Sequence, residues 1–184
     1  MDSKPRLSPA DWITAGFTAL LAEGPSALRA ESLARQVGAT KGSFYWHFAD
    51  VPTFHKAMLD AWETAMLAAI PQELAQAHTT PARLRTFGQS APLIATPTLA
   101  TTPLGPAIRA WAQGDEAAAA TVARIDAACL DALRDLLHSM GITNPEIGRL
   151  ILGAGVGLAE MHLRDGQSPE PAMGSLVDLV LALR

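Results

Sequence analysis

Five ring-bearing residues stand side by side at positions 44 to 48, within the stretch TKGSFYWHF. Successive helix positions point about 100° apart, so no single helix face can bury all five rings. Phe44 and Phe48 are four positions apart and can share a buried face, which turns Tyr45, Trp46 and His47 outward. These three side chains have polar ends that suit phosphates or the edges of a nucleic-acid groove. The alternative is that Tyr45 and Trp46 pack on the following helix.

The residues before this stretch predict two further helices and a tight turn. Ser8 followed by Pro9 is an N-cap and first-turn pair, and it starts a helix over residues 9–22. A short apolar repeat then ends at Gly38, a residue suited to the left-handed conformation that closes a helix. Thr40 is a suitable N-cap for the helix that carries the rings. Two short helices joined by a glycine turn form a helix-turn-helix pattern.

The rest of the chain is also helical in pattern. A long helix follows Asp50, and Pro71 is expected to kink or interrupt it. Four prolines make residues 91–106 loop-like. Further helices are expected from Thr80-Pro81 and over residues 104–114, 115–140, 144–164 and 168–183. The sequence therefore predicts an all-α fold, with residues 1–50 as a three-helix domain and residues 51–184 as a helical bundle.

Charge and cysteine content narrow the class of protein. The chain has a net charge of −4, but residues 1–50 hold five basic and five acidic side chains and are neutral, so charge neither supports nor excludes nucleic-acid binding. The single Cys129 rules out an internal disulfide framework. No apolar run is long enough to cross a membrane, and the N-terminus lacks the apolar segment of a signal peptide. We therefore expect a cytoplasmic protein without a membrane partner.

Catalytic and metal-binding patterns are absent from the sequence. The five histidines are scattered without ligand spacing, and no glycine-rich loop could cradle a phosphate. Cys129 lies on an apolar helical stripe, where a buried structural thiol is the common case. We expect no enzymatic activity, no cofactor and no metal.

The run from Leu28 to Phe48, LRAESLARQVGATKGSFYWHF, resembles the DNA-binding domain of the TetR (tetracycline-repressor) family of bacterial transcription regulators. The resemblance implies that the third helix enters the major groove of a double-stranded DNA operator. It also implies that a larger helical domain binds a small effector and forms a homodimer. Carried over by position, the DNA-facing residues are Thr40, Lys41, Ser43, Tyr45, Trp46 and His47.

Two positions depart from the family pattern. Arg29 stands where the family usually has a threonine that touches a phosphate, and an ionic contact could replace the lost hydroxyl contact. We therefore include Arg29 in the DNA-binding set. Val51 stands where the family usually has a lysine, and valine cannot replace that charge, so the affinity for DNA is expected to be lower or more dependent on DNA shape.

The segment 144–164 contains several glycines, which weaken a solitary helix by up to about 1 kcal/mol each relative to alanine. Small residues let another helix approach closely, and in the family the last two helices of each subunit form the dimer. We therefore expect a dimer interface that includes Gly153, Gly157, Leu176 and Leu179. The alternative is close packing inside one subunit.

The long helices could enclose an effector site between them. The residues that could line a cavity between the long helices are Trp62, Met66, Phe87, Trp111, Ile125, Cys129 and Met161. Their character favours an apolar or aromatic ligand, to which Asp126 and His162 could add polarity, although the same residues would be ordinary core in a protein without a ligand. We therefore predict a ligand-responsive regulator, a repressor released from a palindromic operator by its effector. The alternative is a helical protein that binds a small molecule or a protein and does not act on DNA.

Overall fold

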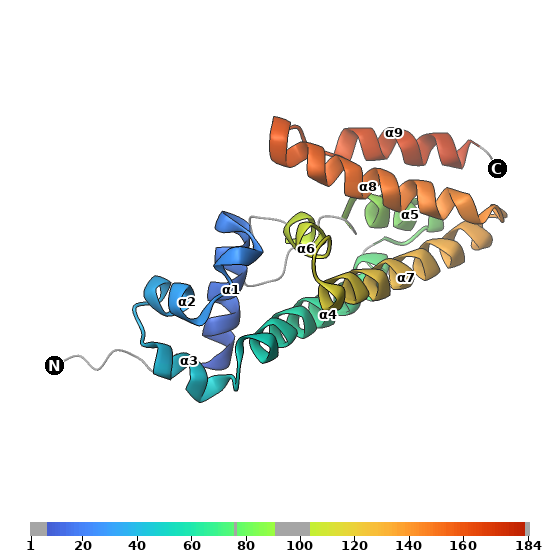
Figure 1. Cartoon of the computed structure of the whole chain (residues 1–184). Helices are drawn as coiled ribbons and strands as arrows, with labels where there is room; N and C mark the ends of the chain where they lie inside the picture. The colour runs from blue at the N-terminus through green and yellow to red at the C-terminus, as the bar shows by residue number, and fades with distance from the viewer. Residues whose placement is uncertain (1–6, 76, 91–103, 183–184) are drawn as a thin grey trace.

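The computed structural model describes residues 7–75, 77–90 and 104–182, and these residues are helical with no β-strand among them. The predicted all-α fold is confirmed (Figure 1). The helices are α1 (Pro9–Glu23), the short 3-10 helix η1 (Pro25–Ala27), α2 (Ala30–Gln36), α3 (Lys41–His47), α4 (Val51–Ala75), α5 (Thr80–Ser90), α6 (Gly105–Trp111), α7 (Glu116–Ser139), α8 (Pro145–Asp165) and α9 (Glu170–Leu181).

Local signals in the sequence fix the start of α1. The backbone N–H of Ser8 donates to Asp11 Oδ2 at 2.7 Å, and the backbone N–H of Asp11 donates to Ser8 Oγ at 3.3 Å. This reciprocal capping box, with Pro9 in the first turn, satisfies amide groups that have no partner within the helix. The backbone bond from Ser8 is also the main reason that the pKa of Asp11 is lowered.

Helices α1 to α3 and the first turns of α4 surround a small aromatic core. The ring of Phe44 makes edge-to-face contacts with Trp12 at 5.4 Å and with Phe54 at 5.2 Å between ring centroids. On α1, a Cβ atom at Gly16 would lie 2.6 Å from Met58 Sδ and 2.7 Å from Phe54 Cζ, both on α4. Only glycine lets α1 and α4 approach this closely, so α4 is held tightly against the three-helix unit.

Helices α4 to α9 form the second part of the molecule. Figure 1 shows α4 and α7 running alongside each other, with α8 and α9 side by side at one edge of the molecule. Arg124 of α7 joins Glu63 of α4 through two hydrogen bonds of 2.6 Å, and this contact lowers the pKa of Glu63. Helix α6 packs against α1, α7 and α8, so it lies between the three-helix unit and α8.

Helix α4 differs from the sequence prediction. It continues through Pro71 to Ala75, so of the two outcomes predicted at Pro71, a kink or an interruption, the interruption is wrong. A proline at this position removes one backbone hydrogen bond, and packing of α4 against α5 and α7 outweighs that loss.

In the predicted loop of residues 91–106, residues 91–103 lie outside the described residues, whereas Leu104 is fully buried and α6 begins at Gly105. None of the described helices is long and apolar enough to cross a membrane.

Candidate nucleic-acid interface

The turn between α2 and α3 orients the candidate DNA-binding surface. Helix α2 ends at Gln36, and Gly38 takes a left-handed conformation with φ of 63°, as its position predicts. Thr40 then caps α3, because its side-chain oxygen accepts a hydrogen bond of 3.2 Å from the backbone N–H of Ser43. The predicted helix-turn-helix is present, and it presents α3 at the end of the molecule farthest from α9 (Figure 1).

The two faces of α3 separate the consecutive rings. Phe44 is fully buried and Phe48, which ends the helix, is 5% exposed, so both lie in the core as expected. Trp46 is 72% exposed and Tyr45 is 43% exposed. The Tyr45 ring meets Phe44 edge to face at 5.3 Å between centroids, so part of it covers the core while part faces solvent. The alternative in which the following helix buries Trp46 does not hold.

Lys41, the first residue of α3, is held by a neighbouring helix. Its Nζ atom lies 2.7 Å from Glu31 Oε1 of α2, and both side chains are more than half exposed. This hydrogen bond and the attraction between the charges raise the pKa of Lys41 and lower the pKa of Glu31. Glu31 could not be predicted from the sequence, since ten positions separate it from Lys41 and only the turn geometry brings them together.

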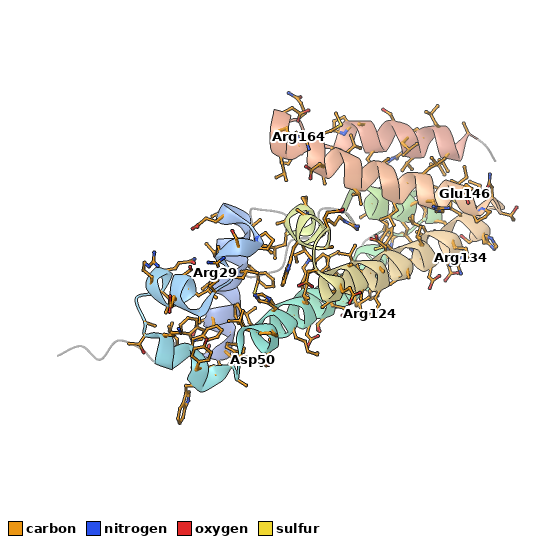
Figure 2. All side chains as sticks on the ribbon, viewed as in Figure 1. Arg29, Asp50, Arg124, Arg134, Glu146 and Arg164 are labelled. Atoms are coloured by element: carbon orange, nitrogen blue, oxygen red, sulfur yellow. The ribbon has the colours of Figure 1, made fainter. Side chains whose placement is uncertain are left out.

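The remaining candidates lie around the same end of the molecule. Arg29 is exposed and precedes the first turn of α2, where it makes no side-chain capping bond (Figure 2). Ser43 and His47 are half-buried on α3. Asp50 receives a hydrogen bond of 2.7 Å from the backbone N–H of Thr53 and so caps the start of α4. Among the residues of the predicted DNA-facing set, Lys41 and Arg29 are therefore the lysine and the arginine that this surface can offer to a phosphate.

His55 of α4 connects this unit to the second part of the molecule. Its Nε2 atom lies 3.0 Å from the carbonyl oxygen of Leu28, just before α2. Its ring also meets Trp111 of α6 edge to face at 5.1 Å between centroids. No spacing in the sequence points to this contact, because the three residues come from separate segments.

The residues predicted to line an effector cavity lie in two environments. Trp62, Met66, Phe87, Trp111, Ile125 and Cys129 are all buried in one continuous apolar core. Met161 is 55% exposed on the outer face of α8, so its place in that set is wrong. Asp126 is bonded to Arg109 of α6 at 2.9 Å, and His162 Nδ1 lies 3.0 Å from the carbonyl oxygen of Gln167. Burial raises the pKa of Cys129 to about 11, and the carboxylate of Asp126 adds to that rise.

A cavity of about 350 Å³ lies between α6 and α8. Its walls are mostly small and apolar, with Arg109 and Gln113 contributed by α6 and the turn after it, and Glu160 contributed by α8. Glu160 accepts a hydrogen bond of 2.8 Å from Arg164. None of the seven predicted effector-lining residues borders this cavity. Within the described residues, no cluster of His, Cys, Asp and Glu side chains could hold a metal.

The residues predicted at a dimer interface lie on α8 and α9. A Cβ atom at Gly153 or at Gly157 would meet no atom within 4 Å, so neither glycine serves close packing inside the subunit. Leu179 is 68% exposed, whereas Leu176 is half-buried against the core. Leu150 and Met161 extend the exposed apolar surface of α8, at 60% and 55% exposure. This surface, comprising Leu150, Gly153, Gly157, Met161 and Leu179, is called the α8–α9 face below.

The chain was compared with known proteins by sequence and by structure. No protein-family model matches it, and no curated protein matches its sequence. Several solved structures do match its fold. A TetR-family transcriptional regulator, PfmR of Thermus thermophilus, aligns with a TM-score of 0.71 at 18% identity, covering 93% of this chain and 97% of that one.

Two other solved structures give the same result. A putative TetR-family regulator from Rhodococcus sp. aligns with a TM-score of 0.68 at 23% identity over 94% of this chain and 97% of its own. The transcriptional regulator FadR of Bacillus subtilis, in complex with stearoyl-CoA, aligns with a TM-score of 0.72 at 13% identity over 95% of this chain and 98% of its own. The chain therefore has the fold of the TetR-family transcriptional regulators.

Proposed function

We propose that this chain is a ligand-responsive transcription regulator, a repressor that binds a palindromic DNA operator as a homodimer. In this proposal residues 1–50 contact DNA and residues 51–184 bind the effector and the second subunit. The observation that carries it is the exposure of Trp46 and Tyr45 on a helix whose opposite side, at Phe44, is buried. A protein gains nothing in stability from presenting these rings to water, whereas a DNA groove can cover them.

The DNA-facing set is Arg29, Thr40, Lys41, Ser43, Tyr45, Trp46 and His47. Lys41 and Arg29 supply charge to phosphates, and Tyr45 and His47 supply polar ends for the same purpose. Trp46 contacts a base or a thymine methyl group, since it is the most exposed ring of the cluster on α3. Thr40 is the N-cap of α3 and Ser43 lies in its first turn, and in this proposal both face the DNA.

The α8–α9 face supports the homodimer. Exposed leucine and methionine side chains flank two glycines that leave the helix surface open to close approach. Exposed apolar side chains gathered on neighbouring helices are typical of an interface rather than of a solvated surface. A two-fold dimer formed there would present two copies of α3 to successive major grooves, with half-sites about 34–36 Å apart.

The cavity between α6 and α8 is the effector site in this proposal, in place of the buried set predicted from the sequence. Its volume is within the range of small-molecule sites, and its walls combine apolar surface with Arg109, Gln113 and Glu160. An apolar ligand with a few polar atoms fits such walls. One structural neighbour, FadR of Bacillus subtilis, was solved in complex with stearoyl-CoA.

Helix α6 supports a route from this cavity to DNA. It forms one wall of the cavity, and its Trp111 contacts His55, which in turn reaches the Leu28 carbonyl beside α2. A ligand that displaces α6 would change these contacts and alter the position of the helix-turn-helix. The ligand can cause this shift only if it binds the protein with α6 displaced more tightly than the protein with α6 in its original position.

Selection of bound sequences from a randomised duplex library tests the proposal. The expected product is an inverted repeat whose half-sites are centred about one helical turn apart. A gel-shift assay with the DNA upstream of the protein's own coding sequence then checks the selected site. Recovery of no enriched sequence and no retention of any duplex would favour the alternative, a helical binding protein that does not act on DNA.

A further inference from the structure

The ion pair between Glu31 and Lys41 bears directly on the proposed contact with DNA. Lys41 is the only lysine or arginine on α3, and in the free protein its ammonium group is bonded to a carboxylate on α2 at 2.7 Å. The nearby Arg35 acts on Glu31 only through a weaker electrostatic interaction. The charge that α3 could offer to a phosphate is thus already matched inside the protein.

The distances decide what happens when a phosphate approaches. An ammonium group has three N–H donors and can bond a carboxylate and a phosphate at once, at about 2.8 Å each. The two anions would then lie at most about 5.6 Å apart, closer than the screening length of about 8 Å at physiological salt, and they would repel each other. If instead the pair opens, the phosphate contact replaces an existing bond. Either way Lys41 contributes less to DNA affinity than an unpaired lysine would.

We infer that Glu31 acts as an intramolecular competitor of the DNA phosphate for Lys41 and thereby restrains binding to DNA of any sequence. This inference rests on the proposed function and adds to it a residue that lowers affinity. The neutral charge of residues 1–50 agrees with such a restraint, because binding without sequence preference depends almost entirely on cations. Glu31 then limits the time the regulator spends on DNA that is not its operator.

The variant Glu31→Gln tests the inference, since it removes the charge and keeps the size of the side chain. The full chain is titrated with a duplex of random sequence over a range of salt concentrations. We expect affinity about threefold to tenfold higher than that of the native protein at moderate salt, from the released lysine and the lost repulsion. The slope of log affinity against log salt concentration should become more negative by up to about one unit, as for one added phosphate contact.

Two controls separate this effect from a general change of charge. Glu146→Gln removes an exposed carboxylate paired with Arg149, at the end of the molecule remote from α3, and it should change affinity by less than about twofold (Figures 1 and 2). In a Lys41→Ala background, Glu31→Gln should lose most of its effect, because the competitor has nothing left to hold. Equal melting temperatures would show that all the variants are folded.

The outcomes distinguish the inference from the function on which it rests. A native protein that binds DNA, with a Glu31→Gln variant of equal or lower affinity, overturns the inference and leaves the proposed function standing. An equal gain in the native and Lys41→Ala backgrounds also overturns it, since Glu31 would then act on DNA directly. If neither the native protein nor Glu31→Gln retains any duplex, the proposed function fails and the inference fails with it.

Discussion

At the scale of single residues, Phe44 and Trp46 stand two positions apart yet occupy opposite environments. Phe44 is fully buried among Trp12, Phe48 and Phe54, while Trp46 is 72% exposed. Phe44→Ala should therefore lower the free energy of unfolding by about 3–5 kcal/mol, because it opens a cavity in a small core. Thermal unfolding followed by circular dichroism measures this loss.

Trp46→Ala is the matched test on the same helix. Its melting temperature should stay within about 2 °C of the native value, because few core contacts are lost. Its preference among DNA sequences should weaken, as expected for a residue that contacts base edges. A Trp46→Ala protein that unfolds while Phe44→Ala merely binds DNA more weakly would mean that α3 is rotated about its axis relative to the structure.

Cys129 offers a second test at the residue scale. Burial holds the pKa of its thiol at about 11, so at pH 8 only about one molecule in a thousand carries the reactive thiolate. The folded protein should therefore react with iodoacetamide far more slowly than the same protein in denaturant, where an ordinary cysteine pKa of about 8.5 applies. Labelling of the native protein as fast as of the unfolded chain would contradict the buried position.

At the scale of helices, α8 allows a test in which stability and assembly change in opposite directions. Gly153→Leu should stabilise the isolated helix by about 0.8–1 kcal/mol, and nothing within the subunit obstructs the new side chain. In the proposed dimer the same leucine would keep the two α8 helices apart and raise the dimer dissociation constant by about tenfold or more, a loss of about 1.4 kcal/mol. Sedimentation equilibrium measures the dissociation constant, and circular dichroism measures the helix content.

The control for this prediction is Gly114→Leu. Gly114 lies in the turn between α6 and α7, its φ is not in the left-handed range, and a Cβ atom there would also meet no neighbour. This variant should leave the oligomeric state unchanged. Gly157 is less suitable for the test because it lines the α6–α8 cavity as well as belonging to the α8–α9 face. A Gly153→Leu protein that assembles like the native one would remove α8 from the interface.

The positions of helices could be predicted from the sequence because the signals that set them act within a few residues. These signals are N-cap residues, glycines that end a helix and the spacing of apolar residues. Ser8, Gly38 and Thr40 each have the role that their type and position indicate. Pro71 shows the limit of such signals, since packing against other helices overrides a local helix breaker. Sequence-distant contacts were not predictable, such as that of Glu31 with Lys41.

The effector site also could not be predicted from sequence patterns. Buried core and the wall of an apolar cavity use the same residue types at the same helical spacing, so Trp62 and Ile125 fit either description. The cavity that the structure contains depends instead on the distance between α6 and α8, and its polar residues Gln113 and Glu160 follow no repeating pattern.

At the scale of the whole molecule, DNA binding and assembly should be coupled. If one dimer occupies one operator, dilution below the dimer dissociation constant should weaken operator binding more steeply than a one-to-one isotherm allows. Light scattering of the complex should give two protomers per duplex. A single protomer per operator, or protection of one asymmetric half-site in footprinting, would contradict the proposed symmetric arrangement.

Gly16 carries no side chain, and the close approach of α1 and α4 that this allows has a mechanical consequence for the molecule. Because α1 lies directly against Met58 and Phe54, we expect the first turns of α4 and the three-helix unit to move as one piece. Helix α4 has 25 residues and is therefore about 37 Å long. Tilting such a lever arm by about 5° about its far end displaces the near end by about 3 Å. In a dimer, opposite tilts of the two α4 helices would change the distance between the two α3 helices by roughly twice that amount. The two α3 helices would then no longer fit successive major grooves.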